Sequence, residues 1–363
     1  MLSQPLVLPC GHRIPNRLAK AATTEHMADS AGRPGPRLAA LYRRWARGGF
    51  GFLMTGNVMV DRKNLEADGN VVVDSWDCVA PMRAWLSATA GTQAWVQIGH
   101  AGALSTSPEP TSPSGVPYRG AKPAVRPSRA LTIDEIKDVV RRFVLASAVA
   151  RDAGCAGVEI HAAHGFLLNQ FLSPATNQRT DDYGGSLENR MRLLLEIVAE
   201  VRGEVGGSFP IAVKLNVSDG RQAGVRWGEE EALLVCQRLA GAGIDLIELS
   251  GGDYQRPLMV GSVRSSNYFR DFACRLKTAT DVPVMLTGGV RSVESMREIL
   301  KSGIADMIGL ARPAIVEPDV AKLILSGELV VAPGSDADDL DVMEMLSWHY
   351  ARMAAIARSE SVR

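Results

Sequence analysis

The stretch GVEIHAAHGFLLNQF, residues 157–171, begins as a short apolar run and ends among polar side chains. Its first six residues, GVEIHA, have the composition of a buried strand. His161 and His164 stand three positions apart at the end of that run, in a chain with six histidines in all, and Phe166 follows. We therefore expect a buried strand whose carboxyl end carries the chemistry of the protein.

Apolar runs like this one recur along the chain, at 17–23, 50–57, 93–99, 210–217, 245–250, 283–289 and 305–311. Several are apolar on both faces, which is typical of parallel strands that are covered on each side. Helical patterns lie between the runs, at 36–48, 76–90, 132–153, 186–205, 229–241, 268–280, 292–302 and 318–326. Thr132 and Glu135 have the spacing of a capping box, which predicts that a helix begins there.

Eight alternations of strand and helix predict an α/β protein with a (β/α)8 TIM barrel. A doubly wound sheet is the competing architecture, but it would need a glycine-rich dinucleotide turn, and the chain has no GxGxxG. We expect the barrel to occupy residues 1–334, with a Pro- and Ser-rich excursion at 101–130. Residues 335–363 should form a C-terminal helical extension of the same domain, which buries its apolar face on the barrel or on a second subunit.

Composition and charge exclude several classes of partner. The 363 residues have a formal net charge of +0 and no basic block, which argues against nucleic acid and anionic membranes. No apolar run reaches the ~18 residues that span a bilayer, and the N-terminus lacks a signal-peptide pattern, so we expect a cytoplasmic protein. The five cysteines are scattered, which predicts buried thiols rather than a zinc site, an iron–sulfur cluster or disulfides.

In a barrel of this kind, catalytic residues lie at the carboxyl ends of the strands. Those positions hold polar and small residues: Thr23, Thr24, Glu25, His26, Gly56, Asn57, Gln97, His100, His161, His164, Lys214, Asn216, Gly251, Gly252, Gly288, Gly289, Ala311 and Arg312. Glycines after the seventh strand let backbone N–H groups approach phosphate oxygens. Because Arg312 follows the eighth strand and can add a charge-assisted clamp, the last four residues of that set predict a phosphate site.

The histidine pair allows three interpretations. His-x-x-His can chelate a metal, but no further Asp, Glu or Cys stands at a matching strand end, so we expect no metal. The two imidazoles could instead have a structural role, bonded to backbone at the strand end. The interpretation we favour is a pair of N–H donors that converge on one substrate oxygen where negative charge develops, such as an enolate oxygen.

The segment HAAHGFLLNQFLSPATNQRTDDYGGSLENRMRLLLEIVAEVR, residues 161–202, resembles the old yellow enzyme family of flavin-dependent ene-reductases. Shorter matches in the same order are NRLAKAATTEHM (16–27), WVQIGHAG (95–102), AVKLNVSD (212–219) and GLAR (309–312). The resemblance covers residues 1–330. It implies an FMN cofactor at the barrel mouth and NADH or NADPH as the hydride donor.

The resemblance also implies roles for individual residues. The FMN phosphate would lie at Gly288, Gly289, Ala311 and Arg312. Gln97 would bond the pyrimidine edge of the flavin, Lys214 would stand near its N1, and Thr24 would tune it through O4. Ala22, Thr23 and Gly56 would lie beside the ring. His161 and His164 would hold the carbonyl oxygen of an enone-type substrate during a ping-pong hydride transfer.

Phe166 departs from the family pattern, because many members have a tyrosine there that protonates the substrate α-carbon. Phenylalanine has no proton to give, so water or another side chain must supply it, or the reaction differs. His26 is the residue that we expect to take this role, in a substrate pocket that it shares with Phe166. No cysteine follows Cys274, so we expect a flavin-only enzyme without the iron–sulfur segment of some relatives.

Three functions therefore remain open at the level of sequence. The first is an FMN-dependent reductase of the activated C=C bond of α,β-unsaturated carbonyl compounds. The second is an oxidative flavoenzyme of the amine demethylase or dehydrogenase type, and the third is a flavin-binding protein without turnover. The histidine pair favours the first, and we expect a homo-oligomer that acts on a small molecule.

Overall fold

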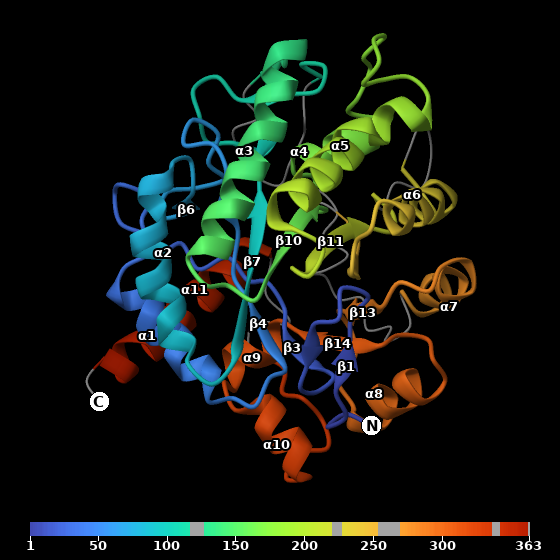
Figure 1. The fold of residues 1–363 in the computed structure, drawn as a ribbon. Helices are drawn as coiled ribbons and strands as arrows, with labels where there is room; N and C mark the ends of the chain where they lie inside the picture. The colour runs from blue at the N-terminus through green and yellow to red at the C-terminus, as the bar shows by residue number, and fades with distance from the viewer. Residues whose placement is uncertain (117–126, 220–226, 253–268, 336–341, 362–363) are drawn as a thin grey trace.

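Eight parallel strands close into a barrel in the computed structural model, which describes residues 1–116, 127–219, 227–252, 269–335 and 342–361 (Figure 1). Around the barrel the strands are β3 (Leu18–Lys20), β4 (Phe52–Met54), β7 (Gln93–Gly99), β10 (Gly157–Ala162), β11 (Ile211–Asn216), β12 (Leu246–Ser250), β13 (Val284–Thr287) and β14 (Met307–Leu310). β14 pairs with β3, which closes the ring. The predicted (β/α)8 barrel is confirmed, and each predicted strand overlaps one of these eight.

The helices that surround the barrel follow the predicted alternation. They are α1 (Pro36–Ala46), α2 (Val79–Leu86), α3 (Ile133–Asp152), α5 (Leu187–Val205), α6 (Glu229–Gly241), α7 (Arg270–Ala279), α8 (Val293–Lys301) and α10 (Val320–Ser326). The capping box at the start of α3 is present, since Thr132 Oγ1 accepts from the Glu135 N–H at 3.2 Å and Glu135 Oε2 accepts from the Thr132 N–H at 2.8 Å. A cap of this kind satisfies N–H groups that the first helical turn leaves unpaired.

Two short helices were not predicted. α4 (Leu167–Leu172) follows the histidine segment directly, and α9 (Arg312–Val316) begins at the predicted phosphate arginine. The excursion after β7 contains a 3-10 turn (Gly102–Leu104) and the strands β8 (Thr111–Ser112) and β9 (Arg129–Ala130). Its residues 117–126 lie outside the described part of the chain.

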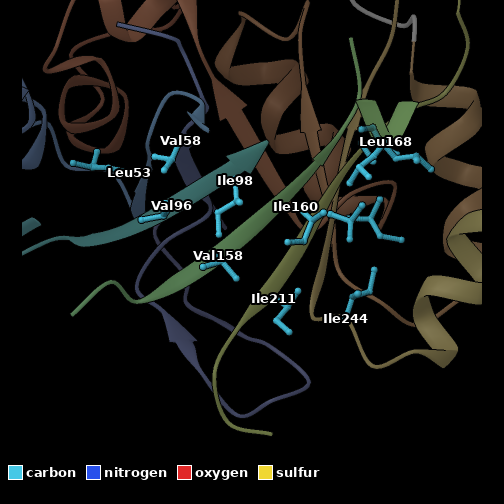
Figure 2. Packing of buried hydrophobic residues seen from close by; sticks show 14 of the residues in the cluster. Leu53, Val58, Val96, Ile98, Val158, Ile160, Leu168, Ile211 and Ile244 are labelled. Carbon is cyan, nitrogen blue, oxygen red and sulfur yellow. The ribbon is translucent and has the colours of Figure 1, made fainter. Parts of the chain in front are cut away.

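The main hydrophobic core fills the space between the strands and the helices. Figure 2 shows part of this layer, with Val96 and Ile98 of β7 beside Val158 and Ile160 of β10. A second apolar cluster fills the lower part of the barrel, where the rings of Phe52 and Trp95 stack at 4.8 Å. Each fully buried large apolar side chain contributes roughly 1.5–3 kcal/mol by leaving water.

A polar layer lies above this apolar plug inside the barrel. The register pairs Glu159 with Gln97 of β7, and pairs Lys214 with Glu248 of β12. Because side chains alternate across a strand, residues two positions along a strand point to the same side of the sheet. His161 is therefore carried two residues above Glu159, at the end of β10.

The C-terminal segment forms α11 (Val342–Ser361), which packs against α1 and α9 of its own barrel (Figure 1). The sequence left open whether the apolar face of this helix packs on the barrel or on a second subunit. In the structure, α1 and α9 of the same chain pack against the helix. Among the described residues, no helix is long and apolar enough to cross a membrane.

Candidate active site

A cavity of about 230 Å³ opens at the carboxyl ends of the barrel strands. Its lining includes twelve predicted site residues: Ala22, Thr23, Thr24, Gln97, His161, His164, Phe166, Lys214, Gly288, Gly289, Ala311 and Arg312. Of the residues that were given a role, Gly56 and His26 lie outside the lining, as do the strand-end residues Glu25, His100, Asn216, Gly251 and Gly252. Among the lining residues that were not predicted, one group lies together on α11, namely Met345, Leu346, His349, Tyr350 and Met353.

Gly56 lies directly behind the cavity wall rather than in it. Its N–H donates to Glu25 Oε1 at 3.1 Å and to the Tyr42 hydroxyl at 3.2 Å. A Cβ at this position would stand 2.3 Å from Glu25 Oε2 and 2.6 Å from the Thr23 carbonyl oxygen. Only glycine fits here, so Gly56 fixes the path of the Thr23–Thr24 segment from behind.

His26 also lies behind the cavity, where its ring packs on Tyr350 at a centroid distance of 4.6 Å and an angle of 43°. Its Nε2 is 3.9 Å from Glu66 Oε2. His26 and His164 are the two non-glycine residues with positive φ among the described residues, at 52° and 60°. Strained backbone of this kind is concentrated at functional sites, because surrounding contacts must hold it in place.

The two histidines of the opening stretch bond to each other. His161 Nε2 lies 3.2 Å from His164 Nδ1, and His164 Nε2 lies 2.5 Å from Ser250 Oγ at the end of β12. The His164 backbone N–H donates to Asn216 Oδ1, which fixes the turn that carries the ring. In this structure His161 is therefore bonded to His164, and His164 is bonded to Ser250. Both rings can donate to one ligand oxygen only if they give up the bond between them.

Both imidazoles are neutral. Burial lowers the pKa of His161 to about 3, and the charge of Lys214 contributes to the shift. Burial and the same lysine lower the pKa of His164 well below its usual value. Each ring therefore carries one N–H, which it can donate to an oxygen where negative charge develops.

An ion pair lies beside the histidines, since Lys214 is the register neighbour of His161 on β11. Lys214 Nζ donates to Glu248 Oε1 at 2.6 Å, with side-chain exposures of 4% and 0%. Gln97 Nε2 donates to Glu159 Oε1 at 2.7 Å. Burial and the adjacent Glu248 raise the pKa of Glu159 well above its usual value, whereas Lys214 keeps the pKa of Glu248 low against the effect of burial. Of the two carboxyl groups, Glu159 is therefore the one that favours its protonated form.

The residues present fit a flavin mononucleotide. Gly288 and Gly289 have φ values of 107° and 76°, and the nearest atom to a Cβ at Gly288 is a Phe269 ring carbon at 3.6 Å. Backbone in this conformation offers N–H groups to an anion. Farther along the wall, Thr23 Oγ1 and Asn57 Oδ1 are buried without a hydrogen-bond partner among the described residues, as expected where a polar ligand completes the site.

Acidic side chains do not contribute to the described lining, whereas Lys214, Arg291 and Arg312 do. Within the described ranges, no group of three or more His, Cys, Asp or Glu could hold a metal ion. The five cysteines are free thiols. Cys78, Cys155 and Cys236 are buried as expected, whereas Cys10 is partly exposed and Cys274 is exposed, which corrects that expectation for two of the five.

Comparison with known proteins identifies the class that this barrel and site define. The sequence matches the NADH:flavin oxidoreductase / NADH oxidase family over residues 2–328. It is 36% identical over 357 residues to the NADH-dependent flavin oxidoreductase iliE of Hypocrea jecorina (strain QM6a), covering 89% of this chain and 88% of the relative. The chain belongs to this family, and it is an NADH:flavin oxidoreductase of the old yellow enzyme type.

Solved structures agree with the fold. An old yellow enzyme homologue from Zymomonas mobilis superimposes with a TM-score of 0.78 at 24% identity, over 95% of this chain and 96% of that chain. Histamine dehydrogenase from Rhizobium sp. 4-9 superimposes with a TM-score of 0.79 at 26% identity, over 90% of this chain and 48% of that chain. The barrel thus resembles both a stand-alone homologue and about half of a larger dehydrogenase.

Proposed function

We propose that this protein is an FMN-dependent NAD(P)H oxidoreductase that reduces the activated C=C bond of α,β-unsaturated carbonyl compounds in a ping-pong reaction. The observation that carries the proposal is the neutral pair His161 and His164 in one cavity with Lys214 and the Gly288–Gly289 turn. FMN supplies reversible two-electron hydride transfer when it is bound there. NADH is the donor to test first, because the curated relative above is NADH-dependent.

The chain's own residues bind and orient the reactants. Gly288, Gly289 and Arg312 would hold the phosphate of FMN, with Ala311 beside them. Gln97, Thr23, Thr24 and Ala22 would contact its ring system, and Lys214 would supply a positive charge near it. The two histidines exchange their mutual bond for the substrate carbonyl oxygen, and both N–H groups then stabilise the charge that develops as the β-carbon accepts a hydride.

Amine oxidation is the alternative, and the similarity to histamine dehydrogenase is the observation that favours it. A cationic amine needs carboxylates or an aromatic cage near the reacting centre. The described lining has the aromatic rings of Phe166 and Tyr350, but it also has cations and no Asp or Glu, so it suits a neutral carbonyl compound better. The lining therefore supports the reductive function over the oxidative one.

One anaerobic spectral series tests the proposal. The flavin absorbance of the purified protein is bleached with NADH or NADPH, and 2-cyclohexenone is then added. Rapid return of the absorbance is the expected result. Flavin that stays bleached until oxygen enters, together with bleaching of the oxidised enzyme by histamine or trimethylamine, would favour the oxidative alternative.

We also propose that the protein is a homo-oligomer. α11 uses one face against α1 and α9 of its own chain, so a second subunit would have to bind elsewhere or to the opposite face of this helix. Light scattering of the eluting protein would give the number of subunits.

A further inference from the structure

α11 places one face of an amphipathic helix against the cavity. The lining residues are Met345, Leu346, His349, Tyr350 and Met353, spaced as neighbours on one side of a helix. Tyr350 is the phenol in this set, and the cavity that it lines also contains His161, His164 and Phe166. The helix thus brings a proton-bearing group from the C-terminus of the chain into the proposed substrate site.

The proposed reduction needs a proton for the substrate α-carbon, from a side chain or from water. Phe166 packs on His161 at a ring-centroid distance of 4.5 Å, and its ring has no exchangeable proton. His161 and His164 are committed to the carbonyl oxygen, and Lys214 is committed to Glu248. The remaining hydroxyls of threonine and serine are far weaker acids than a phenol, which leaves Tyr350 and His349 of α11 as the candidate donors in the described lining. Of these two, Tyr350 is the one whose ring is fixed against His26.

Neighbouring residues hold Tyr350 in place. Its ring packs on His26, which the strained backbone at φ 52° directs toward α11. Behind His26 stands Glu66, which accepts a hydrogen bond from Asn57 Nδ2 at 3.3 Å. The phenol makes no hydrogen bond to the described residues. Burial, Glu66 and Glu25 raise its pKa well above the usual value, so the hydroxyl keeps its proton.

We propose that Tyr350 is the proton donor to the substrate α-carbon and that His26 is its positioning residue. This inference rests on the proposed reduction of an unsaturated carbonyl compound. It moves the donor role that the sequence suggested for His26 to the tyrosine packed against it.

For an enone, the proton transfer forms one C–H bond on the substrate and breaks one O–H bond of the enzyme. Hydride addition to the β-carbon leaves the substrate as an enolate, with the former C=C electron pair shared between the α-carbon and oxygen. That pair forms a C–H bond with the Tyr350 hydroxyl proton, the O–H bond breaks, and tyrosinate remains. Tyrosinate then takes a proton from water. The sum is one enone, one NAD(P)H and one proton giving one saturated ketone and NAD(P)⁺.

Anaerobic stopped-flow kinetics of the holoenzyme test the assignment in Y350F, F166Y and the double variant Y350F/F166Y. A general acid contributes about 10²–10⁴-fold. We therefore expect Y350F to slow flavin reoxidation by 2-cyclohexenone by that factor, and far more than it slows flavin reduction by NADH. The double variant should recover most of the lost rate, because F166Y returns a phenol to the cavity. Y183F is the matched control, since the Tyr183 hydroxyl bonds Glu196 outside the cavity.

Binding provides a readout that does not depend on turnover. Cyclohexanone, the saturated product, should shift the flavin spectrum of the oxidised enzyme with a similar Kd in wild type and Y350F if the histidines alone hold its oxygen. A loss of binding in Y350F as large as the loss of rate would assign Tyr350 to substrate positioning and overturn the proton-donor role.

Two variants of His26 separate positioning from proton donation. H26F keeps a ring against Tyr350 and should retain reoxidation within about threefold, whereas H26A removes the contact and should slow it by at least tenfold. Equal losses in both would show that a ring nitrogen of His26 is required, which overturns its assignment as a positioning residue.

Failure of the proposed enone reduction and failure of the Tyr350 assignment give different results in these experiments. Wild-type enzyme that is not reoxidised by the enone refutes the proposed reduction itself. Wild-type enzyme that is reoxidised, with Y350F reoxidised at the same rate, refutes only the assignment of Tyr350.

Discussion

Replacement of Lys214 by Met tests whether the ion pair under the cavity stabilises the barrel. Lys214 and Glu248 are bonded at 2.6 Å with exposures of 4% and 0%, so neither charge is solvated by bulk water. Removal of one partner of a buried pair costs about 3–5 kcal/mol, because the remaining charge stays desolvated. We expect the free energy of unfolding of the flavin-free K214M protein to fall by this amount, about 3–5 kcal/mol, at pH 8.

The loss should depend on pH with a definite sign. In the wild type, Lys214 keeps the pKa of Glu248 below its usual value, so the contribution of Glu248 to stability is present above its unfolded pKa and is lost as the pH falls. Without the lysine, burial raises the pKa of Glu248 above the unfolded value. K214M therefore loses stability as the pH rises through that pKa, and its difference from wild type should be smaller at pH 5 than at pH 8.

Urea unfolding followed by tryptophan fluorescence measures these differences in K214M, E248Q and the double variant. Because E248Q removes the charge that K214M leaves unpaired, the double variant should lose less stability than K214M alone. K277M is a control for a pair that is partly exposed to solvent, since Lys277 and Asp306 are 22% and 24% exposed, and solvent screening limits such a pair to about 0–1 kcal/mol. Losses that add in the double variant, or a K214M loss as small as that of K277M, would refute the reasoning.

Other variants test the wall, a helix cap and the histidines. G56A should lower both the flavin-to-protein ratio and the Tm, because its Cβ would stand 2.3 Å from a Glu25 oxygen and overpacking costs about 1–3 kcal/mol; a wild-type ratio and Tm would contradict this. T132A should lower the free energy of unfolding in urea by about 1 kcal/mol through loss of the α3 cap, whereas T132S should keep it. A T132A protein as stable as T132S would count against the cap. The pKa of His161 falls from 6.5 to about 3 on folding, so its contribution to stability is present above pH 6.5 and is lost toward pH 3. H161Q should therefore flatten the dependence of unfolding free energy on pH below 6.5, and an unchanged slope would exclude a neutral buried histidine.

The barrel was predictable because its elements are long enough to show their period. α6 has the predicted bounds, Glu229–Gly241, and α3 begins at its predicted cap. α4 and α9 were missed because helices of six and five residues contain too few turns to establish a helical pattern. Their positions are set by the barrel, which anchors each at a strand end.

The site was predictable where topology alone determines position. Parallel barrel strands bring all their carboxyl ends to one mouth, so residues as distant as Gln97 and Arg312 could be expected in one cavity. The packing of α11 could not be predicted in this way. Its amphipathic pattern showed that a face must be buried, but only the folded chain shows that Tyr350 faces the mouth and that His26 stands behind it.

One lysine connects the polar layer of the barrel with the histidines above it. In this layer Lys214 is paired with Glu248, and the pKa of Glu159 is raised well above its usual value by burial and by Glu248. The same ammonium group adds to burial in lowering the pKa of both histidines. A negative charge that develops in the cavity therefore meets a fixed cation and two neutral N–H donors, with no carboxylate in the described lining. Once the histidines exchange their mutual bond for a ligand, such an arrangement can stabilise an oxyanion, and the polarity that makes the barrel sensitive to loss of Lys214 is the same polarity on which the proposed reduction depends.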